Sequence, residues 1–118
     1  MVEATPPQWG SVWWIDLNEP KGSEPGYRRP AVVVSADPFN RSLISTVVVA
    51  MLTSNLRLAD MPGNVTLESG EAGLRRATVI NVTQLVTIDK SCLSELVGHL
   101  GAAAAFELTT GLRQSLQL

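Results

Sequence analysis

Three short segments of the chain carry the polar side chains best suited to chemistry. The first runs from Lys21 to Pro30 and brings Arg28 and Arg29 to the start of an apolar, β-branched run. An arginine side chain presents a planar fork that suits phosphate, and Pro30 biases the backbone of Arg29 towards an extended conformation. The pattern therefore predicts a loop that can bind an anion, although a solvated loop would explain the same charges.

The other two segments offer uncharged polar groups beside apolar runs. Thr53 and Ser54 follow one such run, where their hydroxyl groups can donate to a phosphate oxygen or stabilise a turn, which is the commoner role. Gln84 lies between Thr83 and Leu85 in another run. Its amide is either a ligand contact or a hydrogen-bonded group of a buried strand.

The composition of the 118 residues excludes several other kinds of site. Cys92 and His99 are the only cysteine and the only histidine, which excludes an intramolecular disulfide, a multi-thiolate metal site and a pair of histidines. We interpret Cys92 as a small apolar filler and His99 as a structural residue. Nine basic and eleven acidic residues give a net charge of −2, so any site for nucleic acid must be locally basic.

The overall composition is that of one folded domain. Hydrophobic residues make up 45% of the chain and charged residues 17%, so we expect a single domain over residues 1–118. The longest apolar stretch, Val47 to Leu52, is too short to cross a bilayer, and the first residues lack the pattern of a secretory signal. We therefore expect a cytoplasmic protein.

The hydrophobic pattern predicts short strands that would position these segments. Trp13, Ile15 and Leu17 follow the two-residue period of a strand. Further runs predict strands over residues 30–34, 46–52, 65–67, 78–85 and 96–100, with turn residues between them. Asp89 is expected to cap a short helical turn.

One helix is predicted over residues 102–117, at the end of the chain. Gly111 inside it is expected to cost about 1 kcal/mol relative to alanine. Five to seven strands with one terminal helix indicate a mainly β fold, a small and partly open barrel that the helix closes. The apolar residues that repeat at helical spacing, and should form the buried face of the helix, are Ala105, Leu108, Leu112 and Leu116.

Six motifs follow one another along the chain. They read Gly10-Ser11-Val12-Trp13-Trp14-Ile15-Asp16-Leu17, Gly22-Ser23-Glu24, Arg29-Pro30-Ala31-Val32-Val33-Val34-Ser35, Asn40-Arg41, Val49-Ala50-Met51-Leu52-Thr53-Ser54 and Gln84-Leu85-Val86-Thr87-Ile88-Asp89. This ordered set covers the chain from Trp9 onward and resembles the MazF/PemK-type toxin family.

The resemblance implies an endoribonuclease toxin, or mRNA interferase, of a bacterial type II toxin–antitoxin system. Members of the family share an SH3-like barrel, the MazF/Kid/CcdB-like fold, and form homodimers. They cut single-stranded messenger, transfer or ribosomal RNA at short sequence motifs, without a metal or other cofactor, through attack of the ribose 2′-hydroxyl. The implied partner is an antitoxin whose acidic, disordered segment neutralises a toxin that otherwise inhibits translation and arrests growth.

The resemblance also implies the residues of the site. Arg29 matches the family's catalytic arginine, Thr53 its catalytic threonine and Glu24 an acid near the RNA. Arginine holds its proton too firmly to serve as a base, so we expect Arg29 to stabilise the charge on the phosphorane and Thr53 to donate to the phosphate. Glu24 is a candidate base, although an exposed loop carboxylate is more often solvated, and the identity of the base is left open. The expected RNA-binding residues are Lys21, Arg28, Ser54 and Gln84.

Two alternative functions remain open from the sequence. A toxin of the same fold can poison DNA gyrase by binding it, but that function does not need the matches at Arg29 and Thr53. A small barrel that only binds nucleic acid or protein is the second alternative. Thr83 stands where some family members carry an acid, so a scheme based on an aspartate at that position is not expected here.

Overall fold

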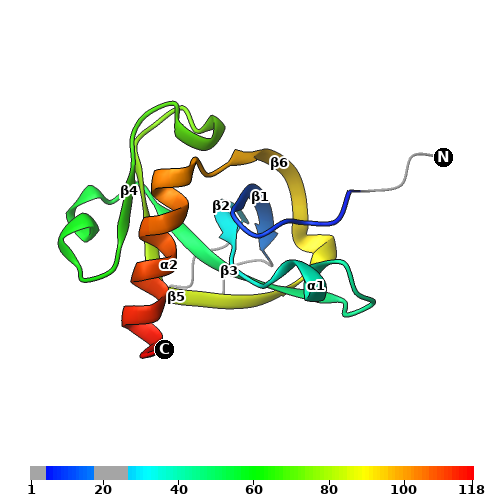
Figure 1. Ribbon diagram of the computed structural model, residues 1–118. Helices are drawn as coiled ribbons and strands as arrows, with labels where there is room; N and C mark the ends of the chain where they lie inside the picture. The colour runs from blue at the N-terminus through cyan, green and yellow to red at the C-terminus, as the bar shows by residue number, and fades with distance from the viewer. Residues whose placement is uncertain (1–4, 18–26) are drawn as a thin grey trace.

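The computed structural model describes residues 5–17 and 27–118, in which six strands form one curled antiparallel sheet (Figure 1). The sheet order is β4–β5–β3–β2–β1–β6, so β4 and β6 are its two edges. This mainly β half-barrel with a C-terminal helix confirms the predicted fold class. The elements are β1 (Ser11–Leu17), β2 (Tyr27–Val33), α1 (Asp37–Asn40), β3 (Thr46–Thr53), η1 (Leu56–Asp60), β4 (Val65–Leu67), η2 (Glu71–Gly73), β5 (Thr78–Asp89), η3 (Lys90–Cys92), β6 (Leu93–His99) and α2 (Ala102–Leu116).

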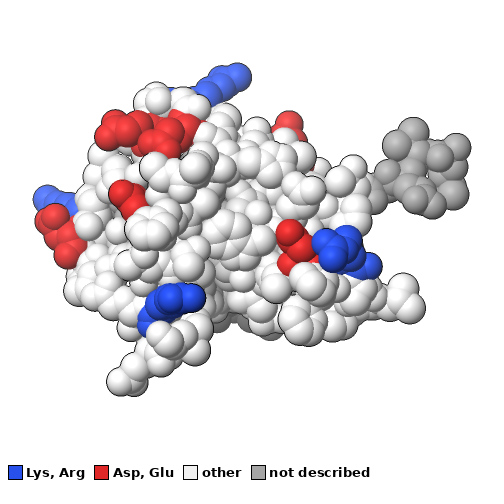
Figure 2. All heavy atoms as spheres, viewed as in Figure 1, with Lys and Arg blue, Asp and Glu red and all other residues white. Residues whose placement is uncertain are grey.

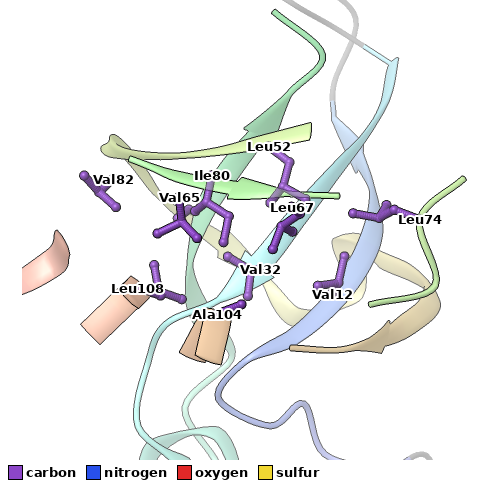
Figure 3. Packing of buried hydrophobic residues seen from close by; sticks show 11 residues of the cluster. Val12, Val32, Leu52, Val65, Leu67, Leu74, Ile80, Val82, Ala104 and Leu108 are labelled. Atoms are coloured by element: carbon purple, nitrogen blue, oxygen red, sulfur yellow. The ribbon is translucent and has the colours of Figure 1, made fainter. Parts of the chain in front are cut away.

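Each face of the sheet carries a hydrophobic cluster, because successive residues of a strand point to opposite sides. Figure 3 shows the first cluster, in which side chains from β4 and β5 meet those of α2. Its buried members are Val12, Val32, Ala50, Leu52, Val65, Leu67, Leu74, Ile80, Val82, Ala104 and Leu108. The second cluster consists of Ile15, Ala31, Val33, Val47, Val49, Met51 and Ile88. The apolar runs in β2 and β3 are continuous because both of their faces are buried.

Helix α2 forms as predicted, and its predicted buried face is confirmed in part. Leu108 is buried and Leu112 packs against the first cluster, but Leu116 is 50% exposed. The other buried residues of the helix are Ala104 and Gly111. A Cβ atom on Gly111 would lie 2.1 Å from the carbonyl oxygen of Gly63, so this position needs glycine for close backbone packing. The helix therefore carries the expected cost of Gly111 because only glycine lets α2 pack this closely against Gly63. No helix in the two described ranges has the length and apolar content required to cross a membrane.

Strands β2, β5 and β6 extend beyond their predicted limits, and β6 begins at Leu93 rather than Leu96. β2 begins at Tyr27, so the two arginines that the sequence placed in a loop belong to the strand. β5 continues to Asp89, beyond a bulge of three residues, 82–84, that have no partner on β3. The predicted cap is confirmed, since Asp89 accepts a hydrogen bond from the backbone N–H of Ser91 at 2.9 Å. This hydrogen bond also lowers the pKa of the Asp89 carboxyl group.

The connection between β4 and β5 folds back against β6. A Cβ atom on Gly73 would lie 2.4 Å from the carbonyl oxygen of Val97, and one on Gly98 would lie 2.5 Å from that of Ala72. Gly73 also has a positive φ of 78°, a conformation that glycine adopts without steric cost. These glycines let the two backbones touch, so the connection forms a wall above the end of the sheet.

Candidate functional site

A groove of about 800 Å³ lies between this wall and the strands. It is lined by residues from β1, β2, β3, β5, β6 and the β4–β5 connection, so it is assembled from most of the chain. The lining is rich in cations and hydroxyl groups. Its polar and aromatic members are Trp14, Arg28, Arg29, Thr53, Ser54, Arg75, Arg76, Thr78 and Glu95.

The register of the central strands brings Arg29 and Thr53 to one place. Ala31 lies opposite Met51 in the last pair of the β2–β3 ladder, and Arg29 and Thr53, each two residues beyond that pair, both line the groove. A terminal nitrogen, Nη2, of Arg29 donates to the carbonyl oxygen of Leu52 over a long 3.4 Å. Within residues 5–17 and 27–118, most of the donors of this guanidinium have no partner and are available to a ligand.

Thr53 ends β3 with its hydroxyl oxygen in a local turn. The backbone N–H of Asn55 donates to Thr53 Oγ1 at 3.1 Å, so the oxygen accepts there, and its proton has no acceptor in the part of the chain that the structure describes. Ser54 follows directly and is exposed. The turn role expected of these hydroxyls is thus real for Thr53, and it leaves the donor role open.

Arg28 is held more firmly than Arg29. Its terminal nitrogen Nη2 contacts a carboxylate oxygen of Glu95 at 2.5 Å, and its guanidinium carbon lies 5.4 Å from the centre of the Trp14 ring. The strand register explains the arrangement, because Glu95 on β6 lies opposite Trp14, which lies opposite Pro30 on β2. Both charged side chains are at least half exposed, so the ion pair adds little stability but partly neutralises Arg28.

Three polar groove residues that precede or begin β5 were not predicted from the sequence. Arg75 and Arg76 are exposed and precede β5, and Thr78, which carries a hydroxyl group, is the first residue of that strand. A signal was present, since Arg75-Arg76 repeats the arrangement of Arg28-Arg29, a double arginine entering an apolar strand. The path of the connection, which brings this pair back over the sheet, has no such signal.

The predicted site residues divide into three groups. Arg28, Arg29, Thr53 and Ser54 all line the groove. Gln84 does not line it, and the interpretation of its amide as buried is wrong, because the bulge of β5 leaves this side chain exposed. The remaining two, Lys21 and Glu24, lie outside the described residues.

The groove concentrates positive charge that the whole chain lacks. Four arginines and one glutamate line it, whereas the net charge of the chain is −2. On the face shown in Figure 2, by contrast, lysine and arginine side chains lie apart on a mostly uncharged surface. Guanidinium groups beside hydroxyl donors are suited to binding an anion with several oxygen atoms, and phosphate is such an anion.

Known proteins of similar sequence and structure share one description. The family model described as "PemK-like, MazF-like toxin of type II toxin-antitoxin system" matches residues 8–116. Endoribonuclease MazF6 of Mycobacterium tuberculosis is 45% identical over 107 residues, which cover 91% of this chain and 94% of that protein. Endoribonuclease EndoA of Bacillus subtilis is 34% identical over 109 residues, which cover 92% and 93% of the two chains.

Solved structures agree with the sequence comparison. MazF from Deinococcus radiodurans superposes with a TM-score of 0.76 at 25% identity and covers 98% of this chain and 100% of its own. An endoribonuclease from a mycobacterial species, solved in complex with its cognate antitoxin, gives a TM-score of 0.78 at 24% identity over 95% and 96% of the chains. The chain therefore belongs to the PemK-like, MazF-like toxins of type II toxin–antitoxin systems.

Proposed function

We propose that the protein is a sequence-specific endoribonuclease toxin that cleaves single-stranded RNA without a metal ion. The observation that carries the proposal is the groove in which Arg29 and Thr53 meet beside three further arginines. Membership of the toxin family and 45% identity to a protein named as an endoribonuclease support the same activity. The family match and the named relatives do not favour gyrase binding, the alternative considered from the sequence.

The proposed reaction is attack of the ribose 2′-hydroxyl on the adjacent phosphate. The 2′-oxygen forms a bond to phosphorus, the bond to the 5′-oxygen of the next nucleotide breaks, and a proton moves from the first oxygen to the second. Arg29 stabilises the negative charge that gathers on the phosphoryl oxygens, and Thr53 donates a hydrogen bond to one of them. Glu24 remains the candidate base and its role stays a prediction.

We propose that the active form is a homodimer and that an antitoxin inhibits it by occupying the groove. A related endoribonuclease has been solved with its cognate antitoxin, which supports an inhibitory partner of this kind. An acidic, disordered segment would pair with the arginines that otherwise face RNA and would meet its ordering cost through those contacts. The cytoplasmic location stays a prediction, and it agrees with messenger RNA as the expected substrate.

A single incubation tests the nuclease proposal. Purified protein is mixed with a long RNA in the presence of EDTA, and the products are separated and their ends analysed. Discrete fragments that carry 5′-hydroxyl ends are expected. Intact RNA after prolonged incubation would remove the proposal, and cleavage that EDTA abolishes would remove its metal independence. Sequencing of the fragment ends then gives the recognition motif.

Competition tests the antitoxin proposal. The cognate antitoxin and an uncleavable, 2′-O-methylated RNA should exclude each other from the toxin, and moderate salt should weaken both complexes. A ternary complex that forms at saturating concentrations of both ligands would mean that inhibition acts at a distance from the groove.

A further inference from the structure

The wall of the groove formed by the β4–β5 connection and the start of β5 contains a buried hydroxyl group. Thr78 is 6% exposed, and its Oγ1 atom has no hydrogen-bond partner among the residues that the structure describes. A buried hydroxyl that makes no hydrogen bond carries a desolvation penalty. Other atoms of Thr78 line the groove, so rotation of this side chain would let a ligand in the groove accept the proton of the buried hydroxyl.

Arg75 and Arg76 precede this hydroxyl and are presented by a well-anchored segment. The Ser69 hydroxyl donates to the carbonyl oxygen of Arg75 at 2.7 Å, and the side chain of Leu74 is buried in the first cluster. In residues 5–17 and 27–118 the only ion pair within 4.0 Å is that of Arg28, so neither Arg75 nor Arg76 has a carboxylate partner there. Both guanidinium groups line the groove.

This second set of donors lies beside the first. Thr53 pairs with Val79 in the β3–β5 ladder, so Thr78 and Thr53 lie on neighbouring strands with their side chains directed to opposite faces, and both residues line the groove at this end of the sheet. Adjacent strands are about 4.8 Å apart. A single strand of RNA that crosses the groove can therefore meet the two sets of donors in succession.

We propose that Arg75, Arg76 and Thr78 form a second phosphate site, which holds the RNA phosphate next to the one that is cleaved. The proposal rests on the endoribonuclease function proposed above and assigns the wall a role in holding substrate. Two guanidinium groups and one hydroxyl offer donors alone, which suits the several oxygens of a phosphodiester. The carboxylates of an antitoxin are the competing occupant, and the experiments below distinguish them.

The first experiment measures cleavage kinetics of an RNA oligonucleotide with the double variant Arg75→Ala/Arg76→Ala. The KM should rise about tenfold with kcat within twofold of the unchanged protein, because the two arginines hold the substrate equally in the ground and transition states. The slope of log KM against the logarithm of the salt concentration should fall by about 0.7 for each phosphate that the variant no longer binds. The matched control is Arg57→Ala/Arg113→Ala, which removes two exposed arginines that lie outside the groove and should leave KM unchanged.

The second experiment isolates the hydroxyl. Thr78→Val should raise KM about threefold without lowering the melting temperature, because the hydroxyl has no protein partner to lose. Thr78→Ser keeps the hydroxyl and should behave as the unchanged protein. A melting temperature that falls in Thr78→Val, with KM unchanged, would assign Thr78 a purely structural role.

The third experiment identifies the phosphate. A series of oligonucleotides carries one uncharged methylphosphonate at each linkage in turn, and the dissociation constants of 2′-O-methylated versions are measured alongside KM. One linkage beside the scissile one should weaken binding by the unchanged protein, and this penalty should vanish in the Arg75→Ala/Arg76→Ala variant. A penalty that persists in the variant, or a variant that loses affinity for antitoxin alone, overturns the second site. Unchanged protein that binds these RNAs but cuts none would contradict the nuclease proposal instead.

Discussion

The two walls of the groove carry similar residues in different states. On one side Arg28 and Arg29 lie at the start of β2, and on the other Arg75 and Arg76 precede β5. Arg28 is paired with Glu95 and stacked on Trp14, whereas no described carboxylate lies within 4.0 Å of the arginines across the groove. The number of cations in a groove is therefore a poor measure of the charge it offers, because partners within the protein decide which cations remain available.

Changing Arg29 should have the largest effect on activity. Arg29→Ala is expected to lower kcat by about 10²- to 10³-fold, the usual cost of removing a donor that stabilises developing charge. The melting temperature should stay unchanged, since the described side chain makes one long hydrogen bond to Leu52. Single-turnover cleavage measures the effect, and Arg28→Ala provides the comparison with a milder loss. Cleavage by Arg29→Ala within threefold of the unchanged protein would make the proposed role wrong.

Thr53 should come next. Thr53→Val keeps the shape of the side chain but removes a donor to the phosphate, and kcat should fall about 10- to 100-fold, as expected for a hydrogen bond to a charged group. Thr53→Ser should recover most of the rate. If Thr53→Ser is as slow as Thr53→Val, the methyl group of Thr53 matters rather than its hydroxyl. The proposed hydrogen bond from Thr53 to the phosphate would then be wrong.

The wall formed by the connection can be displaced by adding one methyl group. Gly73→Ala places a Cβ atom 2.4 Å from the carbonyl oxygen of Val97 at a positive φ, and the free energy of unfolding should fall by roughly 2–5 kcal/mol. Gly70→Ala is the matched control, because Gly70 also has a positive φ but nothing lies within 4 Å of its added Cβ. That variant should lose only about 1–2 kcal/mol. Equal losses in chemical denaturation would show that the contact with β6 contributes nothing.

Glu95 offers the smallest effect and the most direct test of the comparison. Glu95→Gln removes the carboxylate that neutralises Arg28, so RNA should bind about two- to fivefold more tightly and with a steeper dependence on salt. Glu107→Gln, which makes the same change outside the groove, should leave the dissociation constant unchanged. Fluorescence anisotropy with 2′-O-methylated RNA measures both. Unchanged affinity in Glu95→Gln would mean that Arg28 does not face the RNA.

Much of this architecture could be predicted from local patterns. The strands around Ile15, Val32 and Val49 and the terminal helix follow from periodicity. The family resemblance indicates Arg29 and Thr53 as site residues, and both line the groove. The second wall was missed because its position depends on contacts between the β4–β5 connection and β6. Those contacts join segments far apart in the chain, and no local pattern encodes them.

The end of β5 shows a second limit of reading patterns. Ile80 and Val82 face the first cluster and Ile88 faces the second, although all three positions have the same parity. The three unpaired residues of the bulge, an odd number, reverse the alternation. A prediction that follows a constant two-residue period cannot continue the strand through the bulge, so the predicted strand ends at Leu85. For the same reason it assigns Gln84 to a buried strand, although this side chain is exposed.

The edges of the sheet have a consequence for how partners can attach. β4 is only three residues long, and the backbone of Ala72 and Gly73 lies against β6 at Val97 and Gly98. Short and covered edges are the means by which proteins prevent another chain from extending their sheets. An incoming peptide therefore finds little free backbone along β4 or β6 with which to pair as an extra strand. Recognition at these two edges must proceed through side chains, which allows specificity for a particular partner to change by substitution without altering the fold.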